Sequence, residues 1–190
     1  AMELALPPEW TALLPTDRAI TADDVLQLPT GPPLFELLEG RVVVSPFPSV
    51  PHGIVTTNLT LLLGPACPPH LRIFGSPTDW VADAQSVLEP DLCVVRKADT
   101  AGRRLTGTPL LVVEILSPST RRRDLSTKRR LYEAGGVLAY WLIDPTGPRL
   151  TVLELDATGR YTQRADLIGA ATYEATIPYP VTVDLARLLD

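Results

Sequence analysis

Two short apolar segments with a helical pattern between them constrain the fold most strongly. Residues 110–116 read LLVVEIL and residues 138–144 read LAYWLID, and both have the length and composition of buried strands. The segment 119–136 between them predicts a helix that ends at Gly135-Gly136. A strand, a helix and a second strand in this order form a crossover, which makes the two strands parallel and covers the sheet on both faces. The sequence therefore predicts an α/β or mixed α+β fold.

The rest of the chain predicts shorter elements, most of them paired in antiparallel hairpins. A chain of 190 residues without an internal repeat or a low-complexity linker is expected to form one domain, residues 1–190. The expected elements are a short helix at 21–28 capped by Thr21, a hairpin at 34–46 around Glu39-Gly40, a helix at 51–64, strands near 71–75, 78–83 and 87–95, two strands flanking a turn at Gly159, and a short helix in the tail 183–190.

Charge and composition argue against several classes of protein. The net charge of −5 argues against general coating of nucleic acid, although a local basic patch is compatible with it. No apolar run approaches the roughly 20 residues of a membrane helix, and the N-terminus lacks the pattern of a secretion signal, so we expect a cytoplasmic protein without a membrane span. Two cysteines without a CxxC pair and two distant histidines do not make a zinc site.

Glu114 interrupts the first apolar strand. Side chains alternate along a strand, so Glu114 shares a face with Leu110, Val112 and Leu116 and points into a packed layer. An unpaired charge in such a place costs several kcal/mol. Glu114 therefore needs a partner, either an arginine in a structural pair or a functional site.

Lys128 is one of only two lysines among 17 basic residues. Its neighbours three and four positions away place it on the inward stripe of the predicted helix. These neighbours are Asp124, Leu125, Leu131 and Tyr132. The ammonium could reach past the leucines to solvent, pair with Asp124 on the same helix, or approach Glu114 on the strand below.

Asp91 follows Pro90 at the start of another apolar strand. Pro-Asp alone is a weak signal, because turns contain it frequently. Two carboxylates on adjacent strands with a lysine from the covering helix, however, form a set that can hold a divalent metal ion and cleave a phosphodiester. Mg²⁺ prefers such oxygen ligands, and a bound metal ion activates water and neutralises phosphate charge.

Three stretches of the sequence resemble a restriction-endonuclease family that is abundant in cyanobacteria and belongs to the PD-(D/E)XK nuclease superfamily. They are EPDLCVV, PLLVVEILSPSTRRRDLSTKRRLYEAGGVLAYWLIDP, and LFELLEGRVVVSPFPS followed by His52 and its helix. The resemblance covers roughly residues 20–145. It implies a restriction-endonuclease-like fold, with a mixed central sheet flanked by helices, antiparallel hairpins at both ends, and a nuclease core at roughly 34–145.

The resemblance also implies a metal-dependent nuclease in which Asp91 and Glu114 hold Mg²⁺ or Mn²⁺. The superfamily usually carries its lysine two residues after the acidic residue, but that position is Leu116 here. Lys128 is the candidate substitute, because a helix that follows the strand can return its side chain over the strand.

A second departure concerns the first core helix, which often contributes a glutamate in the superfamily. The predicted helix 51–64 contains no acidic residue. Glu36 in the preceding hairpin is the candidate for that place, and an outward-facing hairpin carboxylate is the alternative. His52 is either a residue near the site or a structural histidine.

These observations predict a Mg²⁺-dependent DNA endonuclease with Asp91, Glu114, Lys128 and Glu36 as catalytic residues. The alternative is a nuclease-like fold that binds DNA or a protein without cutting, in which Glu114 and Lys128 form a structural ion pair. A small-molecule enzyme is a weaker alternative, because the sequence contains no phosphate loop, GxSxG elbow or dinucleotide fingerprint.

Two further properties concern partners. We expect the basic clusters at 103–104 and 121–123 to contact DNA, because they flank the acidic residues. We also expect a symmetric homodimer or a higher homo-oligomer, because cutting a duplex requires two strand cleavages.

Overall fold

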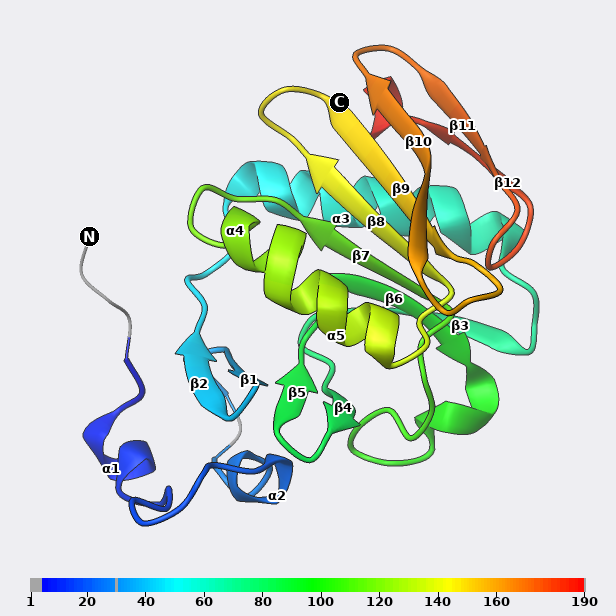
Figure 1. Ribbon diagram of the computed structural model, residues 1–190. Coiled ribbons are helices and arrows are strands. Elements are labelled where there is room, and N and C mark those ends of the chain that lie inside the picture. The colour runs from blue at the N-terminus through cyan, green and yellow to red at the C-terminus, as the bar shows by residue number, and fades with distance from the viewer. Residues whose placement is uncertain (1–4, 30, 190) are drawn as a thin grey trace.

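The computed structural model describes residues 5–29 and 31–189, and its centre is a six-stranded mixed sheet (Figure 1). The strand order is β10-β9-β8-β7-β6-β3. The strands are β3 (Leu71–Gly75), β6 (Leu92–Arg96), β7 (Leu111–Ile115), β8 (Ala139–Asp144), β9 (Arg149–Leu155) and β10 (Tyr161–Ile168). β7 and β8 pair in parallel and the other neighbours are antiparallel, which confirms the predicted crossover and the mixed α+β fold.

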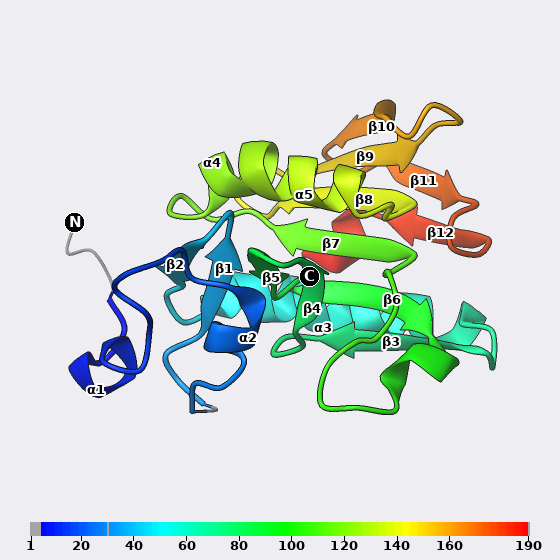
Figure 2. The same ribbon diagram turned by 60° about the horizontal axis from the view of Figure 1, so that its bottom comes forward.

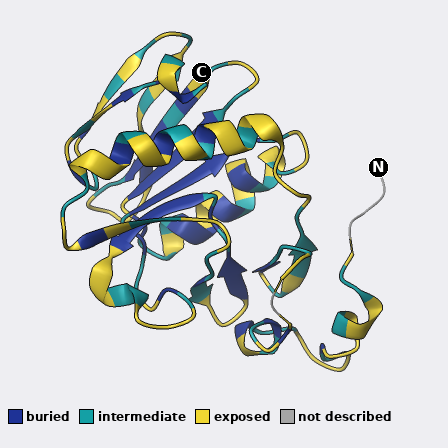
Figure 3. Ribbon diagram, turned by 180° about the vertical axis from the view of Figure 1, so that it is seen from behind, coloured by how far each residue is buried: buried dark blue, intermediate teal, exposed yellow. Residues whose placement is uncertain are grey.

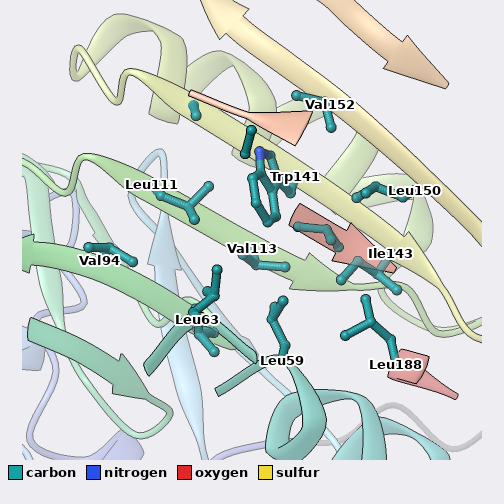
Figure 4. Packing of buried hydrophobic residues seen from close by; sticks show 14 of the residues in the cluster. Leu59, Leu63, Val94, Leu111, Val113, Trp141, Ile143, Leu150, Val152 and Leu188 are labelled. Atoms are coloured by element: carbon teal, nitrogen blue, oxygen red, sulfur yellow. The ribbon is translucent and has the colours of Figure 1, made fainter. Parts of the chain in front are cut away.

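One face of the central sheet is covered by α3 (Val50–Leu63), which confirms the predicted helix. Leu59 and Leu63 of this helix pack against Val113 and Trp141 in the sheet, and all four are fully buried (Figure 4). Figure 3 shows the buried residues concentrated in the central strands. α3 is 14 residues long, and no helix within the described ranges is long and apolar enough to cross a membrane.

The C-terminal segment completes the covering of this face. A hairpin of β11 (Thr172–Ala175) and β12 (Val181–Asp184) packs Val183 into the same core as α3. Neither strand is predicted from the sequence, because each is only four residues long and has a single buried residue. The predicted tail helix is reduced to a 3₁₀ turn at Ala186–Leu188, and Asp190 lies outside the described residues.

The opposite face lies under the crossover helix (Figure 2). This helix is not one regular α-helix. It consists of α4 (Arg121–Arg123), a π-helical turn at Asp124–Lys128, and α5 (Arg129–Ala134). A π turn inserts a residue and shifts the faces of the helix relative to a regular one. Leu125 is consequently exposed instead of inward, while Asp124 and Lys128 are both buried. The Tyr140 hydroxyl on β8 donates to the Asp124 carbonyl, 3.0 Å away, within this turn.

A second sheet of four strands lies beside this helix, in the order β2-β1-β5-β4. β1 (Phe35–Leu38) and β2 (Arg41–Val44) form the predicted hairpin, and Glu39 and Gly40 both have positive φ in its two-residue turn. β4 (Trp80–Asp83) and β5 (Ser86–Leu88) form the next hairpin. The remaining short elements are α1 (Pro8–Thr11), α2 (Ala22–Val25) with Thr21 as its N-cap as predicted, and 3₁₀ turns at Gly64–Ala66 and Lys97–Thr100.

The prediction of one strand at 87–95 is wrong. The chain leaves the smaller sheet after Leu88 and enters the central sheet at Leu92, so Glu89, Pro90 and Asp91 form a junction between the two sheets. Pro90 has no N–H group to donate to a strand ladder, which favours a break at this position. The break places Asp91 and Glu89 between the two sheets.

Gly135 ends the crossover helix against the buried ring of Trp80, which also stacks on Tyr132. A Cβ atom at Gly135 would overlap this ring and lie 3.2 Å from the Leu131 carbonyl oxygen. We expect Gly135→Ala to lower the free energy of unfolding by about 1–3 kcal/mol, because a rigid packed ring must move. Urea denaturation measures this change.

Gly53→Ala is the matched control. Gly53 lies in α3, and an added Cβ would meet nothing within 4 Å. This variant should be unchanged or more stable by about 0.5–1 kcal/mol, because alanine favours a helix interior over glycine. Equal stability of the two variants would contradict the packing account.

Candidate active site

Glu114 lies on β7 with its side chain on the face covered by the crossover helix. Its neighbour Val112 packs on this face, while Val113 and Ile115 pack on the α3 face, so the predicted alternation is observed. Glu114 is only 3% exposed. Its Oε1 atom accepts a hydrogen bond of 2.7 Å from the Tyr132 hydroxyl. The strand therefore carries a carboxylate beneath the helix, as the sequence predicts.

Lys128 is the buried ionic partner of Glu114. Its Nζ atom lies 2.7 Å from Glu114 Oε1, 3.0 Å from Glu36 Oε1 and 3.9 Å from Asp124 Oδ1. The residue is 4% exposed, so the alternative in which the ammonium reaches solvent is wrong. Both remaining alternatives hold together, because Lys128 approaches the strand carboxylate and its own helix neighbour Asp124.

Glu36 enters the same cluster from β1 of the smaller sheet. It is 4% exposed, so the alternative of an outward-facing hairpin carboxylate is wrong. Besides Lys128, its Oε1 atom accepts a hydrogen bond of 2.9 Å from the backbone N–H of Glu89. Glu36 thus connects the hairpin, the crossover helix and the junction between the sheets.

Asp91 is held at the junction by two neighbours. Its Oδ2 atom accepts a hydrogen bond of 2.7 Å from the backbone N–H of Ile115, the residue after Glu114. Its Oδ1 atom lies 3.3 Å from His52 Nε2, at the start of α3. His52 therefore contacts a candidate site residue, and the backbone bond ties Asp91 to the strand that carries Glu114.

A cavity of about 530 Å³ opens over these residues. Five carboxylates line it, from Glu36, Glu89, Asp91, Glu114 and Asp124. Of the described residues, only Lys128 and Arg123 line it with a permanent positive charge. The cavity is therefore strongly acidic and favours a cation, because DNA phosphate alone would be repelled.

The titration of these groups reflects their burial. Burial raises the pKa of Glu114 well above its ordinary value, although Lys128 opposes the effect. Burial likewise raises the pKa of Asp124 to about 6 and that of Glu89 to about 7. Burial alone would lower the pKa of Lys128, but the carboxylates of Glu114 and Glu36 raise it well above its ordinary value. Lys128 therefore stays protonated and cannot serve as a base.

The carboxylates of Asp91 and Glu114 fit a divalent metal ion that also binds water and phosphate. Tyr132 and Lys128 occupy Glu114 Oε1, and its other oxygen has no hydrogen-bond or ion-pair partner among the described residues. Ile115 holds Asp91 Oδ2, which leaves Oδ1 beside His52. The described residues contain no preformed group of three or more His, Cys, Asp or Glu ligands. Mg²⁺ suits such a sparse site, because it usually retains several waters beside one or two carboxylates.

The sequence matches the Uma2 family, described as "Putative restriction endonuclease", over residues 22–183. The chain belongs to this family. Among solved structures it is similar to a crystal structure from Anabaena variabilis, described as a putative nuclease belonging to DUF820. The TM-score is 0.71 at 20% sequence identity, and the match covers 90% of this chain and 97% of that one. At this identity the likeness shows the fold alone. No curated protein matches the sequence.

Three residues of this Uma2 cavity were not among the predicted catalytic residues. Asp124 was considered only as a helix neighbour of Lys128, and Glu89 was placed inside a strand. Arg123 belongs to the RRR run, but a run of three arginines does not show which one faces inward. In the structure Arg121 pairs with Asp144, Arg122 is exposed, and Arg123 lines the cavity.

Lys128 is the ionic partner of the buried carboxylates in this Uma2 chain, so its removal should destabilise the fold. We expect Lys128→Met to lower the free energy of unfolding by about 3–5 kcal/mol at pH 8, because a buried carboxylate loses its partner. The loss should shrink at lower pH, because Glu114 can then take up a proton. Urea denaturation at several pH values measures both effects.

Glu114→Gln in the Lys128→Met background is the control for this prediction. The amide retains the shape of the side chain and removes its charge, so it should restore much of the lost stability. If the double variant is as unstable as Lys128→Met alone, loss of charge pairing is not the cause.

Proposed function

We propose that this protein is a metal-dependent DNA endonuclease that hydrolyses phosphodiester bonds. The observation that carries the proposal is the cavity in which Asp91 and Glu114 face the same space above a buried lysine. Membership in the Uma2 family supports the reaction class. In this proposal Asp91, Glu114, Lys128 and Glu36 form the catalytic set, and the two sheets with their helices act as a single domain.

Asp91 and Glu114 would hold Mg²⁺ or Mn²⁺ in this proposal. When bound, such an ion activates a water molecule and neutralises charge on the phosphate. The protein fixes both carboxylates in advance: the Ile115 N–H holds Asp91, while Tyr132 and Lys128 hold Glu114. Preorganised ligands reduce the rearrangement that the reaction requires.

Lys128 acts in this proposal through the carboxylates around it. An ammonium group has three N–H donors, and three carboxylates lie within 4 Å of Nζ. Lys128 thus orients Glu114 and Glu36 more directly than it could contact a phosphate. Arg123 is the cation that remains for the phosphate, because its buried Nε atom has no hydrogen-bond partner in the described structure.

The contacts of Lys128 with three carboxylates favour a second candidate function, a nuclease-like fold that binds DNA or a protein without cutting. A lysine that is fully occupied by carboxylates can serve the fold alone. The open cavity beside it favours the endonuclease, since a purely structural ion cluster needs no space above it.

Cleavage of supercoiled plasmid tests the endonuclease directly. We expect nicking with Mg²⁺ or Mn²⁺, none with EDTA, and a rate lower by about a hundredfold or more in Asp91→Asn and Glu114→Gln, because each variant removes an anionic ligand. Calorimetric titration with Mn²⁺ measures metal binding independently of cleavage, and both variants should bind more weakly.

Glu39→Gln is the matched control, because Glu39 is a half-exposed carboxylate outside the cavity that pairs with Arg130. It should cut and bind Mn²⁺ like the unmodified protein. Equal nicking by the unmodified protein and by Glu114→Gln would show that this site does not cut DNA. Absence of nicking with intact Mn²⁺ binding would favour the binding module.

Arg123 should contribute to catalysis while Arg122 should not. We expect Arg123→Ala to lower kcat/KM for DNA cleavage by about tenfold to a hundredfold, because a guanidinium in the cavity stabilises phosphate charge. Arg122→Ala removes the same charge from an exposed position one residue away and should cut normally. Equal losses in the two variants would indicate a general charge effect.

We also propose three properties of the protein in the cell. Arg103 and Arg104 contribute to DNA binding with Arg123. The protein acts as a homodimer or a higher homo-oligomer, because a duplex presents two strands to cut. It acts in the cytoplasm, where Mg²⁺ is available.

A further inference from the structure

A second cavity of about 320 Å³ lies next to the acidic one. The two cavities share Leu34 and Glu89 in their linings. Leu34 precedes β1, and Glu89 belongs to the junction between the sheets, so the second cavity lies on the other side of these two residues. Its size is at the lower end of the range for ligand pockets in proteins, which begins at roughly 300 Å³.

Nine of the thirteen residues that line the second cavity are apolar or glycine, and the other four are charged. Most of the apolar residues lie between the end of α2 and β1, among them Leu26, Leu28 and Pro33, and Pro77 adds one from the segment before β4. The leucine, proline and phenylalanine side chains in this lining can contact the face of a planar ring system. An apolar pocket with a few convergent polar groups is the usual form of a ligand site.

The polar groups of the second cavity are Arg103, Arg104, Asp79 and Glu89. Among the described residues, the side chains of Arg103 and Arg104 form neither a hydrogen bond nor an ion pair. Arginine can bind a phosphate or the acceptor edge of a base, and a carboxylate can accept from the amino group of a base. The set therefore matches a nucleotide in both charge and hydrogen-bonding capacity.

We propose that the second cavity binds an unpaired nucleobase of the DNA strand that occupies the acidic cavity. This inference rests on the proposed nuclease function and names its substrate class, DNA with an unpaired nucleotide next to the scissile phosphate. The two cavities are neighbours that share Leu34 and Glu89, which favours a base on the same strand over a separate small ligand. A base within a duplex is stacked on both sides, so it must leave the stack to enter a walled cavity.

The location of the arginines supports the same assignment. Arg103 and Arg104 lie on the loop between the 3₁₀ turn at Lys97–Thr100 and β7, at the cavity that is less acidic. They place positive charge beside the acidic site without entering it. A strand that spans both cavities would meet arginines on one side and the metal-binding carboxylates on the other, with the base between apolar walls.

Binding of fluorescent oligonucleotides tests this subsite. One duplex carries a single unpaired 2-aminopurine, and a matched duplex carries the same base opposite thymine. Titration with the full-length protein in EDTA measures binding without cleavage. We expect about tenfold tighter binding of the unpaired base, which corresponds to about 1.4 kcal/mol, because only an unpaired base can enter the cavity without breaking a base pair.

Two variants locate the effect. Leu26→Trp fills the cavity without changing charge, and Arg103→Ala combined with Arg104→Ala removes its positive groups. In both, the preference for the unpaired base should fall to less than about twofold. Thermal denaturation shows whether each variant is folded. If Leu26→Trp does not fold, the double variant Arg103→Ala, Arg104→Ala provides the test.

Arg41→Ala combined with Arg187→Ala is the charge-matched control, because both arginines are exposed and line neither cavity. It should retain the full preference. The subsite would be overturned by equal binding of the two duplexes, or by a preference that survives in a folded Leu26→Trp protein. Plasmid nicking by the same protein would still support the nuclease function. A protein that neither binds nor cuts any DNA would overturn both.

Discussion

The ammonium of Lys128 holds together parts of the structure that are distant in sequence. It contacts Glu114 on the central sheet, Glu36 on the smaller sheet and Asp124 on its own helix. Burying each of these charges alone would cost several kcal/mol, so each needs the others to remain inside. The π turn changes which residues accompany Lys128 on the inward face: Asp124 and Lys128 are both buried, whereas Leu125, which a regular helix would place on that face, is exposed. Buried charge thus fixes how the two sheets meet beneath the crossover helix.

The junction at Glu89, Pro90 and Asp91 depends on the same cluster. The N–H of Glu89 donates to Glu36, and Asp91 accepts from the N–H of Ile115, so the junction is bonded to a strand of each sheet. A displacement of either sheet would separate Asp91 from Glu114. The carboxylates that could hold a metal ion are therefore positioned by backbone hydrogen bonds and a buried ion cluster, with little dependence on flexible loops.

The sequence alone predicted the elements whose pattern is local and long enough to read. The parallel strands β7 and β8, the hairpin at Glu39-Gly40 and helix α3 each carry a clear apolar period or turn signal. Strand alternation also predicted that Glu114 is buried, while helix periodicity placed Lys128 on the inward face and left open whether its ammonium reaches solvent. The split of residues 87–95 between two sheets did not follow, because an apolar run reads the same whether it pairs with one sheet or with two. The π turn was equally hidden, because helical spacing of apolar residues does not distinguish a π turn from a regular helical turn.

The acidic cavity and its neighbour differ in what they require of a substrate. Five carboxylates face the first cavity against two permanent positive charges, so phosphate can enter only with a cation that offsets the repulsion. The second cavity is lined by apolar side chains, two arginines and two carboxylates, so its charges balance and, in our proposal, it accepts a base without a metal ion. Binding at the second cavity could therefore precede metal binding at the first and bring a strand into place before cleavage begins. Glu89 borders both cavities, and its backbone N–H donates to Glu36, so a single residue lies between the two cavities and is bonded to the acidic cluster. The junction at Glu89, Pro90 and Asp91, which the sequence did not predict, would thus link binding of the base to cleavage of the strand.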